Sequence, residues 1–157
     1  MTTALPDGVT TKLERDSVSA TALVDAPPEE IFDYLRRPAN HAAIAGTGSV
    51  RGTTRGPERL GLGDRFGMKM RIGLPYIIRS KVVELDEGRR IAWCHLGGHR
   101  WRWEVEPAGD GRSTVTETFD MSTARVPPVL RASGFPGRHE HNVAMSVAKL
   151  VSHFAGD

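Results

Sequence analysis

The chain has 157 residues, of which 39% are hydrophobic, and its 21 basic and 19 acidic side chains leave a net charge of +2. This length suits one domain over residues 1–157, which would bury roughly 70% of the surface that its unfolded chain exposes. No apolar run reaches the ~20 residues of a membrane span, and no secretory signal is visible at the N-terminus. A lone Cys94 allows no internal disulfide, so we expect a cytoplasmic protein.

The positive charge is concentrated in the middle of the chain. Residues 36–102 carry 14 basic and 5 acidic side chains, a net charge of +9, and both flanking segments are acidic. A basic segment can indicate nucleic-acid binding. However, Arg100 and Arg102 alternate with Trp101 and Trp103, which is typical of a strand with one solvated face. No block of five like charges occurs, so we expect no nucleic-acid partner.

The first third of the chain predicts a strand followed by two short helices. Residues 1–15 are polar and are expected to form a loose lead-in. Residues 17–26 alternate between polar and apolar side chains, as a half-buried strand does. The Pro-Pro-Glu-Glu segment at 27–30 fits the first turn of a helix, where proline loses no hydrogen bond and carboxylates face the positive end of the helix dipole. A second short helix is expected over 38–44.

From about residue 49 to residue 123 the apolar pattern has a period of two. The expected strands are Asp64–Ile72, Tyr76–Leu85, Arg89–Leu96, Trp101–Glu106 and Ser113–Met121, with a weaker one at Ser49–Arg55. Short glycine-containing turns separate them, which predicts an antiparallel meander. Apolar residues at helical spacing over Glu140–Phe154 predict a long final helix. The fold class is therefore α+β: a curved antiparallel sheet of about seven strands wrapped around a long C-terminal helix.

Four segments resemble a known family. They are DAPPEEIFDYL (25–35), RRIAWC (89–94), WRWEVEPAGDGRSTVTETF (101–119) and the Gly-Phe-Pro break at 134–136. Together with the order of elements, they resemble the START-like (SRPBCC) helix-grip superfamily, in its polyketide cyclase/dehydratase and lipid-transport branch, over about residues 16–155. The resemblance implies a hydrophobic pocket between the sheet and the C-terminal helix, in a family of small-molecule binders, carriers and enzymes. It implies no shared catalytic triad.

Strand alternation predicts which side chains face this pocket, because the apolar face of each strand is the one that gains from burial. The candidate ligand-binding residues are Phe66, Met68, Met70, Trp93, Trp101, Trp103, Phe119, Phe135 and Met145. Phe135, at the helix break, is a candidate cover for the pocket mouth. Further candidates for the mouth are Tyr34, His41, His139 and Asn142, although each of these is more often an ordinary surface residue.

The loop after residue 94 decides which side chains join the tryptophans. A two-residue Gly97-Gly98 turn would pair Cys94 with Trp101 and turn Cys94 inward. A three-residue loop would pair His95 with Trp101 and Trp93 with Trp103. We favour the longer loop because it buries Trp93, and a slip of one residue would turn every side chain to the other face. Pairing Trp103 with Val115 on the next strand then places Glu117 inward as well.

His95 and Glu117 are the candidate catalytic residues. An imidazole and a carboxylate in an apolar pocket can have shifted pKa values and act as acid and base in a cyclisation or dehydration. The alternative is that His95 is a satisfied interior or rim histidine and that Glu117 pairs with an arginine such as Arg79. No cofactor is expected, and metal binding is not expected either, because His139 and His141 lie on different faces of the helix.

Three functions remain open at this point. The first is a module that binds a small hydrophobic or aromatic molecule, such as a lipid or a polyketide. The second is a cofactor-free polyketide cyclase or dehydratase that uses pocket acid and base residues. The third is an interaction module with a filled core. The partner expected under the first two is a small hydrophobic molecule, and a homodimer is possible.

Overall fold

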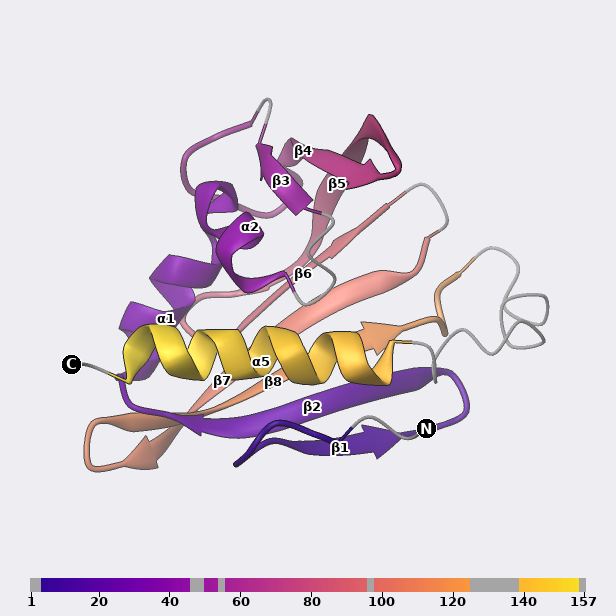
Figure 1. Ribbon diagram of the computed structural model, residues 1–157. Coiled ribbons are helices and arrows are strands. Elements are labelled where there is room, and N and C mark those ends of the chain that lie inside the picture. The colour runs from indigo at the N-terminus through magenta and orange to yellow at the C-terminus, as the bar shows by residue number, and fades with distance from the viewer. Residues whose placement is uncertain (1–3, 46–49, 54–55, 96–97, 125–138, 156–157) are drawn as a thin grey trace.

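One antiparallel sheet of eight strands organises the protein, and a long helix crosses one of its faces (Figure 1). The computed structural model describes residues 4–45, 50–53, 56–95, 98–124 and 139–155. The strands are β1 Thr10–Leu13, β2 Ser17–Val24, β3 Val50–Thr53, β4 Arg65–Ile72, β5 Leu74–Asp86, β6 Arg90–Cys94, β7 Arg100–Gly109 and β8 Arg112–Asp120. The helices are α1 Pro28–Leu35, the 3-10 helix η1 Pro38–Asn40, α2 His41–Ile44 and α5 Glu140–Phe154.

The strand order across the sheet is β1-β2-β8-β7-β6-β5-β4-β3. The strands from β3 to β8 form a continuous meander. Strand β2 pairs with the last strand, β8, rather than with β3, the strand that follows it in the chain. This confirms the predicted α+β architecture of strand, two short helices, meander and C-terminal helix. Among the described residues, no helix has the length and apolar character needed to cross a bilayer.

The sheet has one strand more than the sequence predicted. Residues 10–13, expected in a loose lead-in, form β1 and pair with β2. Three of the four side chains of β1 are exposed. An edge strand of this kind has no buried face, so its sequence carries no apolar alternation that could reveal it.

The helices begin and bury their residues for local reasons that the sequence contains. Helix α1 has proline in its first turn and Glu29 and Glu30 beside it, and it buries Ile31, Phe32 and Leu35. Helix α5 lies over β2 and β8 (Figure 1). The small side chains of Ala20 on β2 and Ala144 on α5 are both fully buried, which suits close packing of the helix on this part of the sheet.

The register of the central hairpin differs from the predicted one. Trp93 pairs with Trp101, and Ile91 pairs with Trp103, so the strands are shifted by two residues from the favoured alignment. Trp103 likewise pairs with Glu117 rather than with Val115. Because side chains alternate with a period of two, a shift of two residues leaves every side chain on the predicted face. The predicted inward face of the tryptophans and of Glu117 is therefore retained, although their neighbours change.

Candidate functional site

An aromatic surface covers the inner face of the sheet where β6, β7 and β8 lie side by side. The register places Trp93, Trp101 and Phe119 in one row across these strands. The rings of Trp101 and Phe119 lie 4.7 Å apart. Phe119 is fully buried, whereas Trp101 is only half-buried. Trp101, in the middle of the row, is therefore the member that still meets solvent, whereas Trp93 and Phe119 on either side of it are buried.

Glu117 lies in the neighbouring row, opposite Trp103 on β7 and Ala20 on β2. Only 4% of this residue is exposed. Burial raises the pKa of Glu117 well above its ordinary value, and a hydrogen bond with Ser146 on α5 only partly opposes this rise. Burial therefore favours the neutral carboxylic acid, which can both donate and accept a hydrogen bond. Arg79, the alternative partner considered for Glu117, is exposed.

His95 follows directly after β6 and faces β5. Its Nδ1 lies 2.7 Å from the hydroxyl oxygen of Ser80, which is buried. Burial, together with the nearby His99, lowers the pKa of His95 to about 4. The imidazole is therefore neutral at pH 7 and keeps one nitrogen able to accept a proton.

His41 begins α2 and is 5% exposed, so it lies in the interior rather than on a rim. Its ring stacks on Trp93, with centroids 4.6 Å apart, and meets Phe66 edge-on at 5.6 Å. Its Nε2 lies 2.9 Å from the carbonyl oxygen of Leu35, to which it can only donate. The Nδ1 atom is thus left as an acceptor, and it is buried without a hydrogen-bond partner among the residues that the structure describes. Burial lowers the pKa of His41 to about 4, so this acceptor is unprotonated at neutral pH.

The start of α5 meets the aromatic row at Trp101 and Phe119. The ring of His139 lies 4.3 Å from that of Phe119 and 5.2 Å from that of Trp101. Asn142 holds His139 through its side-chain amide, 3.2 Å from Nδ1. Met145, one turn further along, is half-buried. These residues could border a ligand that lies on the half-buried Trp101.

The remaining candidates are dispersed. Tyr34 packs against His153 and Phe154, at the other end of α5 from His139. Met68 is buried, and Met70 is partly buried against the core. Phe135 lies outside the described residues.

The two candidate catalytic residues do not touch each other. Cys94 pairs with Arg100, and Arg100 pairs with Asp120, so these three residues form one row across the sheet. His95 lies one residue beyond this row in one direction along the strands, and Glu117 lies three residues from it in the other direction. The offset is about 13 Å along the strands and about 10 Å across them. Each residue has a serine as its own partner instead. Any chemistry that used both would need a substrate that extends between them.

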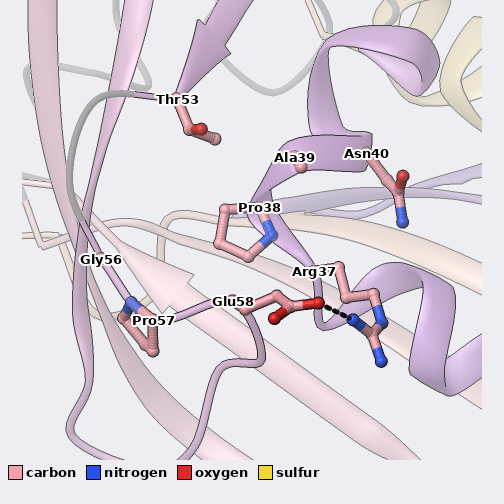
Figure 2. Close-up of a pocket in the computed structure, with 8 residues that line it drawn as sticks. All are labelled: Arg37, Pro38, Ala39, Asn40, Thr53, Gly56, Pro57 and Glu58. Atoms are coloured by element: carbon pink, nitrogen blue, oxygen red, sulfur yellow. Dashed lines mark hydrogen bonds and ion pairs between the residues drawn. The ribbon is translucent and has the colours of Figure 1, made fainter.

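A separate pocket of about 190 Å³ lies at the surface between η1 and the segment before β4. Figure 2 shows Pro38 and Pro57 on its two sides, with the ion pair of Arg37 and Glu58 at one end, 2.8 Å long. None of the candidate site residues lines this pocket. Its lining is partly charged, which is unlike a site for an apolar molecule. Among the described residues, no three His, Cys, Asp or Glu side chains gather as a metal site would require.

Comparison with known proteins assigns a family to this arrangement. The family model described as "Polyketide cyclase / dehydrase and lipid transport" matches residues 15–154. The chain belongs to this family. The uncharacterized protein Rv0088 of Mycobacterium tuberculosis is 36% identical over 143 residues, which cover 88% of this chain and 64% of that protein. The chain thus spans less than two thirds of the length of this curated relative.

Solved structures share the fold of this chain. A protein from Rhodobacter sphaeroides matches with a TM-score of 0.67 and 16% identity, over 96% of this chain and all of the other. The Zhui aromatase/cyclase of a Streptomyces species matches with a TM-score of 0.66 and 18% identity, over 88% of this chain and 93% of the other. At these identities the likeness concerns the fold alone, and it confirms the helix-grip architecture.

Two serines of the site were not singled out from the sequence. Ser80 and Ser146 partner His95 and Glu117, and both are buried. Ser146 follows the buried Val143 by three positions, so helical spacing places it on the buried face of α5. A polar residue on an otherwise apolar helix face was the available signal.

Proposed function

We propose that the inner face of the sheet, with α5 across it, binds a small hydrophobic or aromatic molecule. The observation that carries this proposal is the unpartnered acceptor on His41, buried between Trp93 and Phe66. An unsatisfied buried polar atom costs about 1–3 kcal/mol. A core selected only for stability would place an apolar ring there, whereas a binding site can satisfy the acceptor when its ligand arrives.

The polar groups of the site define what the ligand would offer. The Nδ1 atom of His41 accepts a hydrogen bond, so it suits a hydroxyl donor on the ligand. Glu117 in its neutral form can donate to a carbonyl. The rings around them suit planar or apolar surface. A polycyclic molecule with both phenolic or alcoholic hydroxyls and ketones fits this combination.

A cyclase or dehydratase activity is the second candidate, and one observation favours it. Burial shifts the pKa values of the two candidate groups in opposite directions: it raises the pKa of Glu117 well above its ordinary value and lowers the pKa of His95 to about 4. Such shifts favour the acid form of Glu117 and the base form of His95. Their separation along the sheet requires an extended substrate, and a folded polyketide chain would have the necessary length.

A titration of intrinsic tryptophan fluorescence with a hydroxylated polycyclic ketone tests the binding proposal. We expect saturable quenching, and we expect Trp101→Ala to weaken binding at least about tenfold, because truncating an aromatic anchor commonly costs 2 kcal/mol or more. Leu23→Ala, on the exposed side of β2, is the matched control and should bind normally. Equal weakening by both variants, or no saturable quenching, would contradict the proposal.

Turnover separates the two candidates. If the protein is an enzyme, His95→Ala and Glu117→Gln should each lower kcat at least about a hundredfold with little change in ligand affinity. If it is a carrier, neither variant has a rate to lose, and only affinity responds.

A further inference from the structure

We propose that the β4–β5 hairpin is a docking arm for an anionic lipid surface, with its apolar tip entering the bilayer and its cations meeting the headgroups. The inference is independent of the ligand proposed above. The arm shares its two strands with some of the inner-site candidates, but it uses different residues of those strands. It gives a role to five of the fourteen basic side chains in residues 36–102, which the proposed binding function leaves unused.

The hairpin extends beyond its neighbours in the sheet. Residues Leu74–Ser80 of β5 pair with β4 alone, because the described part of β6 begins its pairing with β5 at Lys81. Gly73, with a φ of 74°, makes the tight turn between the two strands. Figure 1 shows the arm at the end of the sheet opposite β1, away from α5.

The tip of the arm is apolar and exposed. Leu74 is 80% exposed, Ile77 is 59% exposed and Tyr76 is 40% exposed. Large apolar side chains gathered on one protruding turn are unusual on a protein that meets only water. Tyrosine beside them is typical of a segment at the boundary between hydrocarbon and headgroups.

Five cations share one face of the two strands, from the tip, where Lys69 lies opposite Ile77, back toward the base of the arm. The register pairs Arg65 with Lys81, and Arg79, Lys69 and Arg71 follow on the same face. All five are exposed. None of them forms an ion pair with any residue that the structure describes.

On the next strands of the same sheet, the cations form ion pairs. Glu84 on β5 lies 2.8 Å from Arg100 and 2.8 Å from Arg102, and Asp120 lies 3.1 Å from Arg102. On the outer face of the sheet, carboxylates therefore neutralise the arginines near β7, whereas the cations of the arm form no ion pair with a described residue. An external anion can neutralise the cations of the arm.

The combination decides which anionic partner fits. Nucleic acid would satisfy the cations but leaves Leu74 and Ile77 in water. A second copy of this arm would bury the tip but set five cations against five. A bilayer with anionic lipids takes up both parts, since basic residues gather at its surface and apolar side chains enter its interface.

Co-sedimentation of the full chain with vesicles tests this proposal. We expect binding to phosphatidylcholine vesicles that contain about a third phosphatidylglycerol, weak binding to pure phosphatidylcholine, and loss of binding at high salt. The double variant Lys69→Glu with Arg71→Glu should bind at least about 25-fold more weakly, since each cation near such a surface contributes about fivefold. The double variant Leu74→Ser with Ile77→Ser should bind at least about tenfold more weakly to the same vesicles.

Matched controls carry the same chemistry elsewhere on the surface. Arg15→Glu with Arg112→Glu, and Leu13→Ser with Leu23→Ser, change exposed residues outside the arm and should bind as the unchanged protein does. Circular dichroism of every variant checks that the fold is retained. Equal binding to neutral and anionic vesicles, or equal losses in the controls, would overturn the proposal.

Two other results would also overturn it. In the first, the Leu74→Ser with Ile77→Ser variant binds vesicles normally, and the protein binds a DNA duplex as tightly as it binds the vesicles. This result would make the arm a general polyanion site. The second is a dimer in solution that the tip variants dissociate, with no vesicle binding, which would make the tip an interface between copies.

Discussion

The carboxyl group of Glu117, in the middle of β8, forms a hydrogen bond with the hydroxyl of Ser146 on α5, and both residues are at least 95% buried. The bond joins the inner face of the sheet to the helix that covers it. The hydroxyl is a neutral partner, so it offsets only part of the cost of a buried negative charge. Glu117 therefore links the sheet to the helix, and its burial favours the neutral carboxylic acid over the carboxylate.

Replacing Glu117 by Gln should stabilise the protein at alkaline pH. The folded-state pKa of Glu117 lies above its unfolded value, so the unfolding free energy decreases as pH rises from 4.5 through the folded pKa. The glutamine has no proton to lose and should be about 1–3 kcal/mol more stable than the unchanged protein at pH 8, with little difference near pH 4.5. Urea unfolding across this range measures it. Glu106→Gln, at an exposed position on β7, is the control, and an identical pH profile for E117Q and the unchanged protein would refute the prediction.

His41 should make the protein sensitive to mild acid. Burial lowers its pKa to about 4, against 6.5 for the ordinary value, so the unfolded chain takes up the proton first. The unfolding free energy should fall as pH drops from about 6.5 toward 4, by up to about 3 kcal/mol from this residue. His41→Phe keeps a ring against Trp93 and should flatten this slope, as followed by urea unfolding. His141→Phe, at an exposed position on α5, should leave the slope unchanged, and a variant at 41 with the original slope would count against the assignment.

Arg36 should be among the most sensitive charged positions for stability. Its guanidinium donates to the carbonyl oxygen of Leu60 at 2.8 Å and to Glu87 at 2.7 Å, although Arg36 is only 9% exposed. Arg36→Met leaves the Leu60 carbonyl without these donors and should cost about 2–4 kcal/mol in unfolding free energy. Glu87→Gln should cost below about 1 kcal/mol, because the Glu87 side chain is 67% exposed. Similar losses for the two variants would show that the ion pair, and not the buried carbonyl, matters.

Glu84 should support stability down to strongly acidic pH. Hydrogen bonds from Arg102 and Arg100 lower the pKa of Glu84 to about 2. Its contribution is present above the ordinary value of 4.5 and is lost only as pH falls through about 2. Glu84→Gln should cost about 1–2 kcal/mol at pH 7 and much less at pH 2. Thermal unfolding at both pH values measures the difference, and an equal cost at the two would contradict the assignment.

Much of the fold followed from the period of the apolar residues. The final helix occupies the predicted Glu140–Phe154, and the inward faces of β4, β7 and β8 are as expected. The alignment between strands did not follow, because the length of the turn that contains Gly98 sets it and two alignments of the same parity bury the same side chains. The error of two residues placed Glu117 one row away from its true neighbours.

The inner site was only partly predictable for a similar reason. The sequence identifies His41 as a residue at the start of a short helix, where exposure is the ordinary outcome. Its burial against Trp93 depends on how α2 packs on β6, which is a tertiary relationship without a local signal. The same holds for the contact of Glu117 with Ser146, residues from a strand and a helix 29 positions apart.

Native mass spectrometry of the freshly purified protein tests the central claim, that the inner face binds a small hydrophobic molecule, most directly. We expect a discrete mass above that of the chain, which disappears on denaturation and is reduced in Trp101→Ala but not in Leu23→Ala. If the protein is purified without its ligand, the same added mass should appear after incubation with a hydroxylated polycyclic ketone. A chain mass alone in both preparations would contradict the claim and favour a filled core.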